Sequence, residues 1–133
     1  MVTRRERQQE ALDELKALLK EEKEMVLVEG IRDVEALRYL DPNVSIEVCS
    51  HVGKTEHDIA VALSKKTRRV LVLTDFDEKG ITLAKRLSLL LEAEGVHVDR
   101  EFRRKFGRLM GVLRANTVET LDDVAEDIGK VGA

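Results

Sequence analysis

Two short, wholly apolar runs that end in acidic residues constrain the fold of this sequence most strongly. Met25-Val26-Leu27-Val28 leads into Glu29-Gly30, and Val70-Leu71-Val72-Leu73 leads into Thr74-Asp75-Phe76-Asp77. A short continuous apolar run is typical of a strand that is buried on both faces, as in the middle of a parallel sheet. The two runs therefore predict two buried strands whose carboxyl ends carry acidic side chains.

The remaining segments alternate in a way that predicts the fold class. Helices are expected over Thr3–Glu22, Ile31–Leu40, from Thr55 onward, and over Lys79–Glu94, and weaker strands over Val44–Val48 and Val96–Val98. Strands that alternate with helices indicate βαβ units. We therefore predict an α/β fold with a four-stranded, mainly parallel sheet and helices on both faces.

The two ends of the chain are expected to add helices to this sheet. We divide the chain into an N-terminal helix within residues 1–24, a core over 25–99 and a helical extension over 100–133. Gly107 and Gly111 lower helix propensity, so the first helix of the extension is expected to be bent or short. An acidic last helix is expected to begin at Thr117 or Thr120.

Composition limits the classes of function. The chain has 133 residues, 43% of them hydrophobic and 37% charged, which suits one packed domain. Its net charge of −3 lacks the basic footprint of a general nucleic-acid coat protein, so any nucleic-acid contact must be local. The lone Cys49 leaves no disulfide within the chain and no multi-thiol zinc site. Neither a membrane span nor a secretion signal is evident, so we expect a cytoplasmic protein.

Acidic residues at the strand ends predict a metal site. Open parallel sheets bind ligands beyond the carboxyl ends of their strands. If the two apolar strands are neighbours, in the order 2-1-3-4, then Glu29, Asp75 and Asp77 converge there. Magnesium prefers such oxygen ligands, together with water and phosphate oxygens. The alternative is that these acids are exposed loop residues or helix caps. Gly30 and Gly80, just beyond the acids, are expected to permit tight turns and close approach of a substrate.

The same two motifs resemble those of the Toprim superfamily. That family has a Glu-Gly after the first strand and an Asp-x-Asp with a nearby glycine after the third, as in Glu29-Gly30 and Asp75-Phe76-Asp77. The resemblance covers about Met25 to Val98 and implies a three-layer, Rossmann-like Toprim domain. It also implies that Glu29 serves as general acid or base and metal ligand. Asp75 and Asp77 would hold one or two magnesium ions, with manganese as a substitute.

Several members of that superfamily require parts that this sequence lacks. Topoisomerases need a nucleophilic tyrosine on a separate domain, and primases and recombination-repair proteins commonly carry zinc modules, which this sequence lacks. The chain is most similar to small stand-alone Toprim proteins and to the Toprim part of ribosomal-RNA maturation nucleases. The resemblance implies magnesium-dependent chemistry on the phosphodiesters of RNA or DNA, as in an RNA-processing or DNA-repair nuclease.

Basic residues after the fourth strand are the expected substrate contacts. They follow a strand end and comprise Arg100, Arg103, Arg104 and Arg108, with Lys105 between them. The alternative for this cluster is a solvated helix face. Asp33 is expected to be a first-turn helix acid that also tunes the site. His51 and His57 are not assigned to the site.

Three other functions compete with this interpretation, and the positions of the residues argue against the first two. Leu73-Thr74-Asp75-Phe76-Asp77 superficially resembles the nucleophile motif of haloacid-dehalogenase-like phosphatases, but that motif belongs on a first strand. A receiver domain would need a lysine on a fifth strand. The third alternative is a non-catalytic, magnesium-binding module that recognises nucleic acid or a partner protein. The terminal helices either cover the sheet or form a homodimer.

Overall fold

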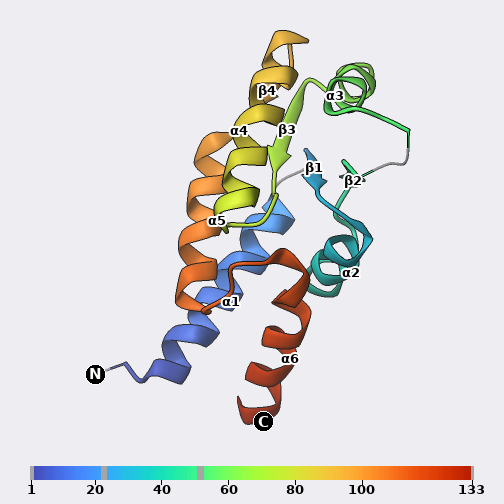
Figure 1. Ribbon diagram of the computed structural model, residues 1–133. Helices are drawn as coiled ribbons and strands as arrows, with labels where there is room; N and C mark the ends of the chain where they lie inside the picture. Colours follow the sequence, from blue (N-terminus) through green and yellow to red (C-terminus); the bar gives the residue numbers. More distant parts are fainter. Residues whose placement is uncertain (1, 22–23, 51–52, 133) are drawn as a thin grey trace.

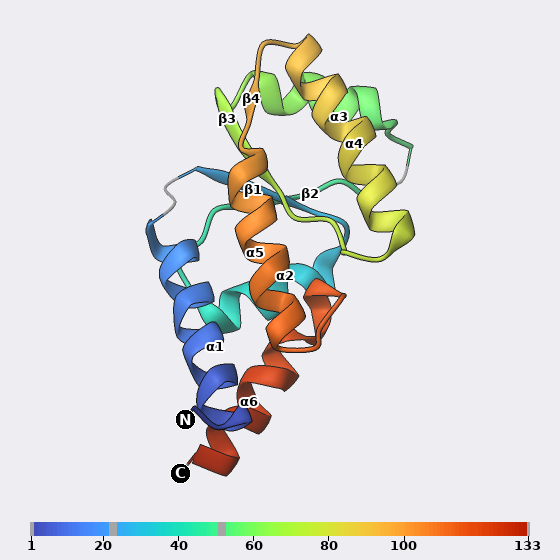
Figure 2. The same ribbon diagram turned by 90° about the vertical axis from the view of Figure 1, so that its left-hand side faces the viewer.

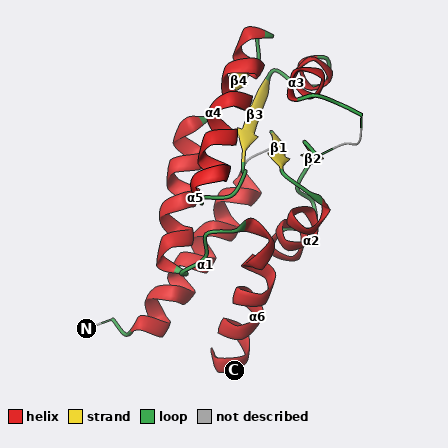
Figure 3. Ribbon diagram, in the orientation of Figure 1, coloured by secondary structure: helices red, strands yellow, loops and turns green. Residues whose placement is uncertain are grey.

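The computed structural model describes residues 2–21, 24–50 and 53–132, which form one sheet with helices around it (Figures 1 and 3). The elements in chain order are α1 (Arg4–Glu21), β1 (Met25–Val28), α2 (Ile31–Leu40), β2 (Ile46–Val48), α3 (Glu56–Ser64), β3 (Arg69–Val72), α4 (Glu78–Ala93), β4 (His97–Val98), α5 (Arg100–Val112), the 3-10 helix η1 (Val118–Thr120) and α6 (Leu121–Gly132). This confirms the predicted α/β class with one four-stranded sheet.

The sheet places the two apolar strands side by side at its centre. Its order is β2-β1-β3-β4, and the pairs β1–β2, β1–β3 and β3–β4 are all parallel. Val26 lies opposite Leu71, and Leu27 lies opposite Val72. The predicted order 2-1-3-4 is therefore confirmed, and the segments that follow β1 and β3 meet at the carboxyl edge of the sheet.

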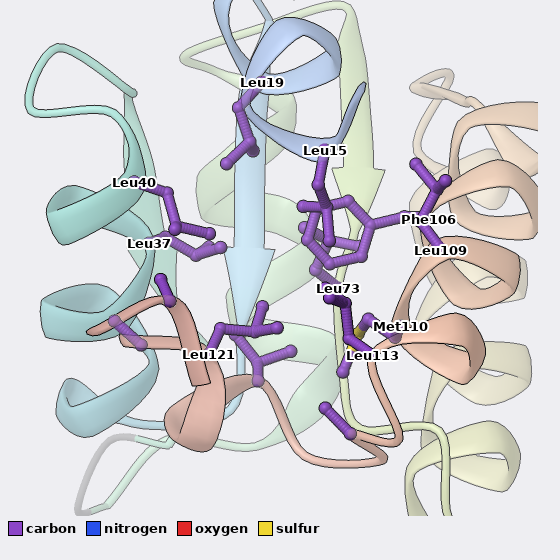
Figure 4. Close-up of a cluster of buried hydrophobic side chains, with 14 of the residues drawn as sticks. Leu15, Leu19, Leu37, Leu40, Leu73, Phe106, Leu109, Met110, Leu113 and Leu121 are labelled. Atoms are coloured by element: carbon purple, nitrogen blue, oxygen red, sulfur yellow. The ribbon is translucent and has the colours of Figure 1, made fainter. Parts of the chain in front are cut away.

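The alternation of side chains along β1 and β3 gives the sheet two apolar faces. Leu27, Val70 and Val72 pack with α3 and α4 in one core cluster. Val26 and Leu71 point to the other face and pack with α1, α2, α5 and α6 in the larger cluster (Figure 4). Because both faces are covered, the strands can be apolar throughout, and the domain has three layers (Figure 2).

The helical ends of the chain belong to the larger core. Leu15 and Leu19 of α1 and Phe106 of α5 are fully buried in that cluster. The α1 helix packs against α5 and α6, and α6 also packs against α2. The segments 1–24 and 100–133 therefore share their core with residues 25–99. Within the described residues, no helix combines the length and apolarity that a membrane span needs.

The structure corrects the expectation for the first helix of the extension. Despite Gly107 and Gly111, α5 is one continuous helix over Arg100–Val112. Gly107 lies against the ring of Phe76, where a Cβ would come within 2.6 Å of Cε1. The missing side chain at this position is therefore a packing requirement, and burial of the neighbouring Phe102 and Phe106 outweighs the low helix propensity.

The two glycines of α5 give a matched stability prediction. Gly107→Ala is expected to lower the free energy of unfolding by about 1–3 kcal/mol, because the new methyl group overlaps the Phe76 ring. Gly111→Ala is expected to raise it by about 0.5–1 kcal/mol, because no atom lies within 4 Å of its Cβ position. Urea unfolding of both variants checks this, and equal effects of the two substitutions would contradict the packing role of Gly107.

Candidate metal and phosphate site

Glu29 and Asp75 meet at the carboxyl ends of the two central strands. The parallel ladder continues past β3, where the Leu73 N–H donates to the Leu27 carbonyl over 2.8 Å. Two residues further on, the Asp75 N–H donates to Oε2 of Glu29 over 3.2 Å. The predicted convergence of these two carboxylates follows directly from the register of β1 and β3.

The Glu29 carboxyl has an unusual proton affinity. Its pKa is raised from 4.5 to about 7. Burial is the largest cause, and the neighbouring Asp75 carboxyl also contributes. The Asp75 N–H opposes this shift because it favours the charged form. Without a cation, the negative charge of Glu29 at this position therefore lowers the stability of the folded protein.

Three further carboxylates line the same cleft, which has a volume of about 580 Å³. Asp33 is buried, and its Oδ2 accepts the Gly30 N–H over 2.9 Å. Burial raises the pKa of Asp33, and the charges of Asp75 and Glu119 add to the effect. Glu119 lies in η1, and Glu56 of α3 forms an ion pair with Arg86. The expectation that Asp33 is a first-turn acid near the site agrees with this geometry.

The segment between α5 and α6 closes one side of the site, and the sequence patterns did not reveal it. The Val118 N–H donates to Oδ1 of Asp75 over 2.8 Å. The Phe76 N–H donates to the Asn116 carbonyl, also over 2.8 Å. Backbone groups make both contacts across about 40 residues of sequence, so residue types carry no signal for them. Glu119 enters the cleft as a consequence.

Asp77, the third predicted ligand, has a different position. Its Oδ1 accepts the Gly80 N–H over 2.8 Å and caps α4, and it does not line the cleft of Glu29 and Asp75. Gly80 is required by the chain's own backbone, because a Cβ there would lie 2.0 Å from the Asp75 carbonyl oxygen. Gly30 lines the cleft, and no atom lies within 4 Å of its Cβ position. Of the two glycines, Gly30 is the one that leaves room for a ligand.

Arg103 holds the loop that carries Asp75. Its guanidinium donates to the carbonyls of Val72, Thr74 and Asp75 over 3.2, 2.8 and 3.0 Å. It also stacks on the Phe76 ring at 4.2 Å from the centroid. Along the free edge of β3, the last hydrogen bond from the β4 side is donated by the Asp99 N–H to the Val70 carbonyl. Arg103 therefore supplies the donors for the carbonyls that follow, where β4 has ended. Burial lowers the pKa of Arg103 to about 10, so the guanidinium stays charged at neutral pH.

The other predicted substrate arginines lie away from the cleft. Arg100 forms a two-pronged ion pair with Glu92 of α4, and Arg104 pairs with Glu101 on its own helix. Arg108 is exposed on α5. The cation that lines the cleft of Glu29 is Arg32, and Lys79 lines a second cleft of about 560 Å³ that also borders Glu29.

Two remaining side chains bear on the chemistry. Cys49 is half-buried beside Glu29, and burial together with the Glu29 charge raises the pKa of its thiol to about 11. A thiol with that pKa is a poor nucleophile at neutral pH. His57 is exposed on α3, and His51 lies outside the described residues.

The donor set fits a hard divalent cation held by few protein ligands. Glu29 and Asp75 offer carboxylate oxygens side by side, and a cation would relieve the repulsion that raises the pKa of Glu29. In the described part of the chain, no group of three or more His, Cys, Asp or Glu side chains is arranged around one metal position. Such a site suits magnesium, which keeps several waters and takes further oxygens from a phosphate.

Comparisons with known proteins agree with this geometry. The Toprim domain matches residues 24–106. The chain is 41% identical over 96 residues to a UPF0292 protein of Thermococcus gammatolerans, covering 72% of this chain and 70% of that protein. It is 37% identical over 110 residues to a UPF0292 protein of Pyrococcus furiosus, covering 83% and 80%. The solved structure of a protein from Aquifex aeolicus is similar, with a TM-score of 0.63, 27% identity, and coverage of 84% and 94%.

Removing the Glu29 charge is expected to stabilise the metal-free protein. The folded state binds a proton at Glu29 up to about pH 7, whereas the unfolded state loses it near pH 4.5, so wild-type stability falls as the pH rises between these values. Glu29→Gln lacks this fall. Its unfolding midpoint in a chelating buffer should therefore exceed that of wild type by about 3–6 °C at pH 8, with a smaller difference at pH 5.

Glu94→Gln, which removes an exposed carboxyl from the far end of α4, is the control and should show no such pH dependence. A Glu29→Gln midpoint below that of wild type at pH 8 would contradict the electrostatic account.

Replacing the planar guanidinium of Arg103 is expected to lower the stability of the protein. Arg103→Lys keeps the charge but cannot serve three carbonyls at once, so it should lower the free energy of unfolding by about 2–4 kcal/mol. Arg104→Lys, one residue along the same helix, should stay within about 0.5 kcal/mol of wild type. Chemical denaturation measures both variants, and equal stabilities would exclude the proposed anchoring by Arg103.

Proposed function

The chain belongs to the Toprim domain family and to the UPF0292 group of proteins, and on this premise we propose that it performs magnesium-dependent phosphodiester chemistry on nucleic acid. We place this activity in RNA processing or DNA repair, as a nuclease. Family membership supports a metal-binding, nucleic-acid-related function, and the cleft of Glu29 and Asp75 is the part of the molecule that suits it.

One observation carries the proposal. The Glu29 carboxylate is held against the Asp75 N–H, beside the Asp75 carboxylate, in a cleft with room for a phosphate group. Acids placed together at such a cost to stability are typical of sites that bind cations or transfer protons. In this proposal Glu29 and Asp75 are the metal ligands, and Asp77 stays a predicted ligand for a second ion.

The residues of the cleft have separable roles in the proposed reaction. A bound divalent cation would neutralise charge that develops on the scissile phosphate. The Glu29 carboxylate can accept a proton from an attacking water and return it to the leaving oxygen. Arg103 and the Val118 N–H keep the Asp75 loop in place. They are positioning groups.

The substrate phosphate has a binding surface in the same cleft. At the N-terminus of α2, Gly30 has no side chain to accept the first-turn N–H groups, Asp33 Oδ2 accepts the Gly30 N–H, and Arg32 follows in the first turn. Free N–H groups at a helix N-terminus and a cation together favour an anion. Lys79 lines the second cleft that borders Glu29. We therefore assign the phosphate contacts at the cleft to Arg32 and Lys79, while substrate contact through Arg100, Arg104 and Arg108 stays a prediction.

A second candidate function is favoured by the sparse ligand set. Asp77 is engaged as a helix cap, and the described residues provide no ready-made site with three carboxylates around one position. A cation held mainly by Glu29, Asp75 and a phosphate would suit a module that binds nucleic acid through the metal without cutting it.

Cleavage of structured RNAs and DNA duplexes by wild type, Asp75→Asn and Glu29→Gln separates these functions. With magnesium or manganese, wild type is expected to cut one polymer, and both variants are expected to lose at least about 100-fold in rate because metal and proton transfer both depend on these carboxyls. Glu94→Gln, at the far end of α4, is the control and should cut like wild type.

The stability of the same proteins under titration with magnesium provides the second readout. A wild type that is stabilised by magnesium but cuts neither polymer would support the binding module and overturn the nuclease. A wild type that neither gains stability with magnesium or manganese nor cuts would overturn the metal site itself.

A further inference from the structure

Three arginines from the two ends of the chain line two adjoining clefts that are separate from the cleft of Glu29 and Asp75. Arg4 and Arg7 belong to the first turn of α1, and Arg114 follows α5. With Gln8 they border clefts of about 360 and 370 Å³, which share Arg4 and Gln8. We call Arg4, Arg7 and Arg114 the arginine cluster. All three lie outside residues 24–106, the part that matches the Toprim domain.

Arg114 occupies a backbone conformation that disfavours arginine. Its φ of 58° lies in the left-handed region, and it is the one non-glycine residue with positive φ in the described chain. The turn ends α5 in the usual way, because the Ala115 N–H donates to the Met110 carbonyl over 2.9 Å. Glycine is the residue that commonly fills this position after a helix. An arginine here adds an exposed cation at the expense of stability.

Arg4 and Arg7 are also placed against local preference. The N-terminus of α1 is capped by Thr3, whose Oγ1 accepts the Glu6 N–H over 3.1 Å. The first turn of a helix favours acidic side chains, because its N-terminus carries partial positive charge. None of the three arginines forms an ion pair with another described residue. The acidic side chain that borders these clefts is Asp127.

The elements that carry the arginine cluster extend beyond the carboxyl ends of the strands, where Glu29 and Asp75 lie. The strands point toward the end of the molecule where the start of α1 and the end of α5 lie (Figure 1). Arg114 is four residues before Val118, whose N–H contacts Asp75. Four residues span at most about 14 Å, which equals about four nucleotides along one strand.

We propose that Arg4, Arg7 and Arg114 form a phosphate-binding surface that holds the backbone of the nucleic acid whose scissile segment lies at Glu29 and Asp75. The inference rests on the proposed function for the identity of its ligand. Two independent violations of local preference place cations that pair with no described residue around the same clefts, in a protein whose net charge is −3. Proteins accept such violations where function requires them.

Arg114→Gly provides a test that separates binding from folding. Glycine relieves the left-handed backbone, so the unfolding midpoint should stay equal or rise, while the affinity for nucleic acid should fall about 3- to 10-fold. Adding Arg4→Gln and Arg7→Gln should reduce the slope of log affinity against log salt by about 0.9 per lost contact with duplex DNA. Lys85→Gln, on the exposed side of α4, removes one charge from the opposite layer and is the control.

Fluorescence anisotropy in a chelating buffer measures binding to a labelled RNA duplex and to a DNA duplex of the same sequence. Loss of affinity and of salt slope in the arginine variants, but not in Lys85→Gln, would support the surface, and the two duplexes distinguish which polymer it holds. Equal affinities for wild type and the triple variant, or no binding of wild type to either duplex, would overturn it.

Its failure is distinguishable from failure of the proposed function. Binding in the chelating buffer reports the arginine cluster alone, because the arginine cluster needs no metal, whereas the proposed cutting requires magnesium or manganese. Arginine-dependent binding without metal-dependent cutting would overturn the nuclease and leave the surface standing. Metal-dependent cutting with unchanged binding in the triple variant would support the nuclease and overturn the surface.

Discussion

The parallel pairing of β1 with β3 is the interaction on which the rest of the structure depends. It buries Val26 and Leu71 on one face and Leu27 and Val72 on the other, so each strand contributes to both cores. The same register brings the Asp75 N–H onto the Glu29 carboxylate just beyond the sheet. Burial on both faces keeps the two strands paired at the centre of the sheet, and their observed register fixes the geometry of the acids.

The helical extension completes the site as well as the core. Arg103 supplies donors to the carbonyls beyond the end of β4, and Val118 supplies an N–H to Asp75. Val118 and Glu119 lie outside the matched Toprim residues, which end at 106. The surroundings of Asp75 therefore combine a sheet that lies within the matched Toprim residues with a segment that lies outside them.

Charge is placed unfavourably at two positions beyond the sheet. The acids of the cleft raise the pKa of Glu29, and Arg114 holds a cation in a left-handed turn. Other elements follow local preference, as in the reciprocal capping of α3 by Thr55 and Asp58. The contrast supports the two proposed sites, because a folded protein retains unfavourable charge where a ligand of opposite sign compensates for it.

The sequence by itself determined the class of fold and the positions of acids after the two apolar strands, whereas the order of the strands, and with it the meeting of Glu29 with Asp75, was a condition that the structure meets. Apolar periodicity and the positions of acids after strands are local patterns, and packing of two-sided strands leaves few arrangements for them. Only the tertiary structure decided that Asp77 caps α4, that Arg103 anchors a loop, and that Val118 and Glu119 reach the site. These contacts use backbone groups or join residues far apart in the chain. A helix cap was one of two readings that the sequence left open for Asp77, whereas no residue pattern encodes the contacts of Arg103 and Val118, because any residue type can supply a backbone N–H or carbonyl.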